Sequence, residues 1–194
     1  MKSKNTVFAS KFVISLQKTD MSTKRVFIYV IISFTILLFI GFLPDASIII
    51  PVEHANASDY NKASFWYYPW GKSITHKGVD IFSPLGTKVI APCDGLILKT
   101  ASNALGGNYV LMLGAKWRLH YFAHLNATYT VPFSYVHKGE VIAAVGNTGN
   151  AYGKAPHLHY AIYTMIPYLH QMDTCHQGIQ KIWYINPIQL FGKD

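Results

Sequence analysis

The chain of 194 residues is long enough for one domain with a sizeable core. Hydrophobic residues make up 51% of it and charged residues only 13%, about half of the roughly 25% that is usual in soluble domains. The formal net charge is +8, but residues 44–194 carry 11 Lys or Arg against 8 Asp or Glu, with no basic cluster. A net charge this small, without a basic cluster, argues against nucleic-acid binding. Most of the excess of hydrophobic residues lies in one segment.

That segment, residues 26–43 (VFIYVIISFTILLFIGFL), contains no charged residue. A helix of this length is about 27 Å long, close to the roughly 30 Å hydrocarbon core of a bilayer. Residues 1–25 carry six Lys or Arg against one acid, Asp20. Under the positive-inside rule we expect a basic cytoplasmic tail (1–25), one transmembrane anchor (26–43) and a remainder that lies outside the cytoplasm.

A cleaved signal peptide is the alternative, because Ala55 and Ala57 in HANAS (54–58) form an Ala-x-Ala site. Signal peptides usually have an apolar region of roughly 7–15 residues with cleavage close behind it. Here the apolar run is longer and the site lies well downstream of it, so the sequence favours the uncleaved anchor. Initiation at Met21 would remove most of the basic tail and weaken that interpretation.

Residues 44–62 are of mixed polar character without periodicity, which is typical of a tether. From residue 63 the sequence changes to short β-prone runs separated by Gly, Pro and Asn. These runs are residues 78–82, 87–91, 95–100, 108–113, 117–125, 140–145 and 157–164. Their lengths and spacing predict a mainly β domain with an antiparallel sheet over residues 63–194, closed by a strand end and a turn in 183–191.

Two cysteines, Cys93 and Cys175, lie in this domain. An exported domain can contain a disulfide, and two cysteines permit one bridge. Two separate thiols are an equal alternative, because the sequence does not show whether the residues are close together.

Histidines and one aspartate supply the candidate chemistry. In APHLHYAI (155–162), alternation along a strand points His157 and His159 to the same face. Two imidazoles on an apolar face need a polar partner. In HKGVD (76–80), His76 and Asp80 share a face of an extended segment, and Gly78 between them permits a tight bend.

His124 ends the run HYFAH (120–124), and alternation places His120 on the same face. Zinc accepts His nitrogen and carboxylate oxygen, and a catalytic zinc site keeps three protein ligands with the fourth position open. Two histidines and one acid from these motifs meet that requirement, although their spacing alone leaves the choice among them open.

The chain resembles the lysostaphin-like, LytM-type zinc endopeptidases that cut bacterial peptidoglycan. The resemblance rests on the motifs HKGVDIFSPLGTKVIAPCDGLIL (76–98), YFAHL (121–125), KGEVIAAVGNTGNAYGKAPHLHY (138–160) and INP (185–187). It runs from about residue 71 to 190 and keeps the blocks His-x-x-x-Asp, Pro-x-Gly-Thr, Tyr/Phe-x-His and His-x-His in order. It implies that residues 63–194 are a LytM-type peptidase domain, an antiparallel β-sheet groove with a metal at its floor.

Carried over residue by residue, the resemblance implies that one zinc ion is bound by His76, Asp80 and His159. His124 and His157 then match the family's two catalytic histidines, which lie beside the metal without binding it. A neighbouring histidine can take the proton of the attacking water, and the other can protonate the leaving amine. The sequence leaves the division of these two roles open.

Two positions depart from the family's pattern. His120 lies where relatives often carry Thr, so it is either an additional groove residue or a histidine that is partly buried or at the rim. Cys93 lies in a turn where a polar residue is more usual. Neither departure affects the five metal and catalytic positions.

The apolar run and the resemblance together predict a single-pass protein of the bacterial inner (cytoplasmic) membrane, with its N-terminus in the cytoplasm and its catalytic domain in the periplasm or otherwise outside the cytoplasm. Its expected partners are peptidoglycan and, through residues 26–43, the membrane. The expected function is hydrolysis of peptide bonds in peptidoglycan during cell-wall remodelling. The stem-peptide cross-link is the favoured bond, and a glycine bridge is the alternative.

The alternative is a non-catalytic LytM-type domain that binds the wall or activates an amidase, and a third possibility is a β domain that stores or senses metal. Because all five positions are filled, the sequence favours the enzyme.

Overall fold

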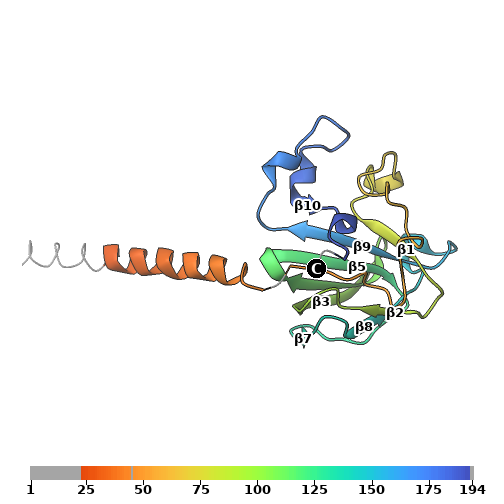
Figure 1. The fold of residues 1–194 in the computed structure, drawn as a ribbon, viewed down its shortest axis with the longest axis horizontal. Coiled ribbons are helices and arrows are strands. Elements are labelled where there is room, and N and C mark those ends of the chain that lie inside the picture. The colour runs from red at the N-terminus through yellow and green to blue at the C-terminus, as the bar shows by residue number, and fades with distance from the viewer. Residues whose placement is uncertain (1–22, 45, 193–194) are drawn as a thin grey trace, which may run out of the picture. The chain divides into compact units, whose positions relative to one another are not determined.

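The computed structural model describes residues 23–44 and 46–192, which divide into two units between Leu43 and Pro44 (Figure 1). In the first unit a helix runs from Thr23 to Ile40, long and apolar enough to cross a membrane, a criterion that a signal sequence would also meet. The helix ends before the predicted boundary at Leu43, because residues 41–43 form a turn that begins at the poor helix former Gly41. Most of the predicted basic tail lies outside the described residues.

The second unit is mainly β, as predicted, and its strands pair antiparallel in two sheets (Figure 1). The larger sheet has the order β1-β9-β5-β4-β3-β7, with β10 also paired to β9, and the smaller has the order β2-β8-β6. The strands of the larger sheet are β1 (Val79–Phe82), β3 (Gly95–Asn103), β4 (Gly107–Gly114), β5 (Arg118–Leu125), β7 (Tyr135–Val136), β9 (His157–Thr164) and β10 (Tyr184–Ile185). Those of the smaller sheet are β2 (Lys88–Ile90), β6 (Ala127–Thr128) and β8 (Val141–Ala144).

The helices described within this unit are short 3-10 turns that connect the strands. They are η1 (Gly71–Ser73), η2 (Ala115–Trp117), η3 (Gly149–Ala151), η4 (Leu169–Gln171), η5 (Gln180–Trp183) and η6 (Pro187–Gln189). Every run of residues that we expected to be a strand between 78 and 164 contains one.

The two faces of the central strands differ in character because side chains alternate along them. Strands β5 and β9 pair in a register that sets Phe122 opposite Tyr160 and Ala123 opposite His159. Phe122 and Tyr160 are fully buried, and this side is the core face of the sheet. The opposite side, here called the site face, carries His159, with the Tyr121 ring 6.5 Å from its imidazole centroid.

Residues 46–62 do not form the tether that we expected. Ile48 and Val52 are buried in the core of the domain. Ile48 forms a β-bridge with Phe191, and Val52 forms another with Val89. The segment is therefore part of the domain, because each of these apolar residues covers core surface contributed by a distant part of the sequence.

The cysteines remain separate. Cys93 is buried, Cys175 is exposed, and both are free thiols. Of the two alternatives left open by the sequence, the structure shows the one without a disulfide.

Candidate metal and catalytic site

Three side chains converge at one point on the site face. His76 lies in the loop before β1, Asp80 lies on β1, and His159 is the register partner of Asp80 on β9. His159 Nδ1 lies 2.8 Å from Asp80 Oδ1 and 3.1 Å from His76 Nε2, which is itself 3.1 Å from Asp80 Oδ1. One potential ligand atom from each residue lies within 4.8 Å of the others, so the structure brings together the three predicted metal ligands.

His76 is held in the orientation that a metal ligand needs. Its Nδ1–H donates a hydrogen bond of 3.1 Å to the main-chain carbonyl of Ser64, which leaves the lone pair on Nε2 directed at Asp80 and His159. The ring is buried and stacks on Trp70 at a centroid distance of 4.1 Å. The sequence motifs signal neither contact, because one uses a main-chain atom and the other an aromatic residue outside the motifs.

Asp80 stays ionised in this environment. Burial alone would raise the pKa of its carboxyl, but the hydrogen bond from His159 Nδ1–H and the adjacent His76 ring outweigh burial and hold that pKa well below its usual range. Two imidazoles with one carboxylate form a donor set that suits zinc, and the chain offers them within ligating distance of a common point.

His124 and His157 lie beside this trio and outside it. Their ring centroids are 5.0 Å apart, and the His124 ring is 5.9 Å from that of His159. His157 Nε2 is 4.0 Å from Asp80 Oδ2. All five residues that the sequence singled out for the centre therefore gather in one place.

Both flanking histidines are oriented by main-chain carbonyls. His124 Nδ1–H donates to Thr148 O at 2.9 Å, and His157 Nδ1–H donates to Ala155 O at 2.8 Å. Each ring is thereby held as the tautomer whose Nε2 is free to accept a proton. Burial, followed by the neighbouring His159 and His157, lowers the pKa of His124 to about 4, so this imidazole is neutral near pH 7.

His120 does not reach the groove, so of the two alternatives left open by the sequence the additional groove residue is ruled out. It is only 1% exposed and lies on the core face, where its Nδ1 is 2.6 Å from Tyr160 Oη and its Nε2 is 3.7 Å from Cys93 Sγ. Alternation failed because His124 has a left-handed backbone, with φ of 63°, which turns its side chain away from the face that His120 occupies.

A second connection joins the loop around His76 to the long segment 165–183. Trp66 Nε1 donates to His176 O at 3.0 Å, and the Gln177 Oε1 atom accepts hydrogen bonds from Thr75 Oγ1 and Lys77 Nζ, each 2.7 Å long. These contacts fix the loop that carries the first ligand to a part of the chain about 100 residues away, and no motif in the sequence indicated them.

Comparisons with known proteins agree with this geometry. The family model for Peptidase family M23 matches residues 74–172. The chain is 33% identical over 90 residues to the peptidoglycan DD-endopeptidase ShyC of Vibrio cholerae, an alignment that covers 46% of this chain and 20% of ShyC. It is 35% identical over 115 residues to the L-Ala–D-Glu endopeptidase of Bacillus subtilis, covering 55% of this chain and 35% of that protein.

Among solved structures, the catalytic domain of lysostaphin from Staphylococcus simulans matches with a TM-score of 0.53 and 25% identity. The match covers 70% of this chain and 97% of that domain. The chain spans about a fifth to a third of the length of the curated relatives it matches.

Proposed function

The chain belongs to Peptidase family M23, whose model matches just over half of it, and on this premise we propose that it is a membrane-anchored zinc metalloendopeptidase that hydrolyses peptide bonds in peptidoglycan. The observation that carries the proposal is the convergence of His76, Asp80 and His159, with the rings of His124 and His157 beside them. A domain that only activates an amidase would not need such a complete set.

His76, Asp80 and His159 are the residues that would hold the ion. Zinc bound there supplies a Lewis acid that polarises a carbonyl group and acidifies water. The Ser64 carbonyl keeps the His76 tautomer fixed for this role, and the ionised Asp80 supplies the negative charge.

The flanking histidines perform the proton transfers in this proposal. One ring can accept a proton from the attacking water at Nε2. The histidinium so formed, or the other ring once it has taken up a proton, can deliver a proton to the amine that leaves. Both rings are locked by hydrogen bonds from Nδ1 to main-chain carbonyls, which maintains their alignment without further side chains.

The substrate proposal follows the relatives. The V. cholerae protein is named as a peptidoglycan DD-endopeptidase and the B. subtilis protein as an L-Ala–D-Glu endopeptidase. We propose the stem-peptide cross-link as the bond that this chain cuts.

Anchoring by the helix Thr23–Ile40 is the second part of the proposal, with the N-terminus in the cytoplasm and the domain in the periplasm. The packing of residues 46–57 supports the uncleaved form. Cleavage after Ala57 would remove Ile48 and Val52, two buried residues of the domain core. The mass of the protein isolated from membranes tests this point, because a chain that begins at Ser58 would contradict the anchor.

The activity is tested by incubating the purified full chain with purified sacculi, with and without a chelator and with zinc restored. We expect muropeptide products that depend on zinc, and their masses identify the bond. Absence of zinc-dependent products would refute the enzyme, and products cut between L-Ala and D-Glu would refute the cross-link as substrate.

Two neighbouring substitutions separate the roles of the histidines. His159→Ala should abolish zinc binding in calorimetric titration and abolish activity with it. His157→Ala should retain most zinc binding while losing turnover. Equal loss of zinc from both variants would contradict the division between ligand and catalytic histidine.

A further inference from the structure

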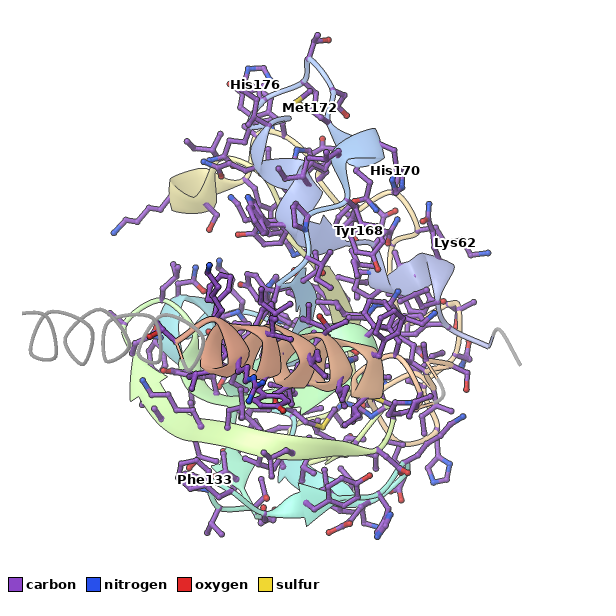
Figure 2. All side chains as sticks on the ribbon, turned by 90° about the vertical axis from the view of Figure 1, so that its left-hand side faces the viewer. Lys62, Phe133, Tyr168, His170, Met172 and His176 are labelled. Carbon is purple, nitrogen blue, oxygen red and sulfur yellow. The ribbon has the colours of Figure 1, made fainter. Side chains whose placement is uncertain are left out.

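Residues 129–135 form an exposed apolar loop, here called the apolar loop, that the proposed catalytic function does not use. Four large side chains alternate along it and project outward: Tyr129 is 62% exposed, Val131 66%, Phe133 79% and Tyr135 59%. In Figure 2, Phe133 lies at the edge of the domain, well separated from Tyr168 and His170 of the segment 165–183. An exposed group of this kind marks a surface that meets a partner.

The loop is built to hold these side chains outward. Thr130 Oγ1 and Ser134 Oγ are hydrogen-bonded at 2.7 Å, and Ser134 Oγ also donates to Val131 O. Phe133 N donates to Ile97 O on β3, and Phe133 has a left-handed backbone with φ of 67°. A bulky residue in this conformation is strained, so the surrounding bonds maintain its exposure against a backbone preference.

Strand β7, which begins at the last residue of the apolar loop, leads to the point where the chain enters the domain from the apolar helix. Lys138, two residues after β7, donates a hydrogen bond of 3.3 Å from Nζ to Ser47 Oγ. Residues 41–47 connect Ser47 to the end of the helix at Ile40, and even when fully extended they span at most about 25 Å. If the helix crosses the bilayer, this part of the domain is held close to the membrane surface.

The chemistry of the loop fits that surface. Tyrosine and phenylalanine are amphipathic or apolar rings suited to the boundary between headgroups and acyl chains. The apolar loop contains no charged residue, so none of its own groups repels anionic headgroups. Beyond its end, Asp94 and Glu140 accept hydrogen bonds from Lys138 N and His137 N.

We propose that the apolar loop docks on the lipid bilayer that holds the helix. The catalytic domain would then keep a defined orientation on the membrane and would not tumble freely at the end of its connection to the helix. This inference rests on the anchoring part of the proposed function. It does not depend on the peptidase activity.

The test uses the full chain reconstituted in vesicles of phosphatidylethanolamine and phosphatidylglycerol, with or without bromine on the acyl chains. Bromine quenches the fluorescence of an indole that touches the acyl region. Phe133→Trp places an indole in the apolar loop, and Tyr152→Trp places one at an equally open position, 85% exposed, in the turn after η3. Tyr135→Trp is a second probe in case the first variant fails to fold, and the unsubstituted chain gives the background of the four native Trp residues.

We expect the indole introduced by Phe133→Trp to lose most of its emission in brominated vesicles, while that of Tyr152→Trp is unaffected. If the protein floats with the vesicles but the two introduced indoles are quenched equally, the docking is overturned and the anchor stands. Protein that does not float with the vesicles would overturn the anchor, and the docking with it. Emission at position 133 that responds to sacculi or to protein concentration, without lipid quenching, would assign the loop to the wall polymer or to a second copy of the chain.

Discussion

Replacing His120 by glutamine tests how completely the core excludes charge. Burial lowers the pKa of His120 to about 3, and the nearby Arg118 charge acts in the same direction. The neutral ring satisfies both of its neighbours, Tyr160 Oη and Cys93 Sγ, with one donor and one acceptor nitrogen. Glutamine keeps an amide group within reach of Tyr160 but has no group that titrates.

The direction in which pH changes the free energy of unfolding follows from proton binding by His120. Above the ordinary histidine pKa of 6.5, the side chain is neutral in both states and stability is unaffected. Below pH 6.5 His120 binds a proton in the unfolded chain but stays neutral in the folded chain. The free energy of unfolding therefore falls as the pH drops from 6.5 toward 3. At about pH 5 this difference amounts to about 2 kcal/mol, since each pKa unit corresponds to about 1.4 kcal/mol.

The measurement is urea unfolding of the full chain in detergent with a chelator present, followed by Trp fluorescence, at about pH 7.5 and about pH 5. All four Trp residues lie in the β domain, so the signal reports its unfolding. Between about pH 7.5 and about pH 5 the free energy of unfolding of the unsubstituted protein should fall by about 2 kcal/mol more than that of the His120→Gln variant. Burial raises the pKa of Cys93 to about 11 and that of Tyr160 well above its usual value, so neither titrates in this range. Equal losses in both proteins would refute the reasoning.

The remaining predictions concern the loops around the centre. A side chain at Gly107, where φ is +61°, would overlap Thr148 and the amide that follows it. Gly107→Ala should therefore lower the free energy of unfolding of the domain by more than about 2 kcal/mol. It should also lower activity, because the Thr148 carbonyl that orients His124 would be displaced. Gly86→Ala is the control, with φ of +87° and open space, and should cost only about 1–2 kcal/mol of backbone strain with activity unchanged; equal effects would argue against the overlap. Gln177→Ala leaves the buried Thr75 hydroxyl without its acceptor and should lower the free energy of unfolding by about 1–3 kcal/mol, whereas an unchanged urea midpoint would show that the connection to segment 165–183 contributes nothing.

The features that could be predicted from the sequence are those that depend on a repeating local pattern of apolar and polar residues. Period-two alternation located the strands and placed His157 and His159 on one face, and the structure agrees on both. The same rule failed for His120, because alternation holds only while the backbone stays extended and His124 leaves that conformation. The motif around His124 does not mark this break, because it lacks the glycine that most often adopts a left-handed backbone.

Long-range packing was the other part that the sequence could not predict. Ile48 and Val52 belong to the short apolar run IIIPV (48–52), which has no period that would indicate burial. Their partners, Phe191 and Val89, lie elsewhere in the chain and are recognisable only once the sheets have formed. The segment therefore looked like a tether, although it completes the core.

The carbonyls that orient the histidines have a consequence for how this centre tolerates mutation. His76, His124 and His157 are each anchored through Nδ1 to a main-chain oxygen, at residues 64, 148 and 155. A main-chain oxygen is present whatever the codon specifies, so no side-chain replacement at Ser64 or Ala155 deletes the acceptor. Random drift at these positions can change the bulk and polarity around the centre, but it can remove the acceptors only by moving the backbone. We expect libraries randomised at residues 64 and 155 to yield many active clones, and libraries randomised at the histidines themselves to yield almost none.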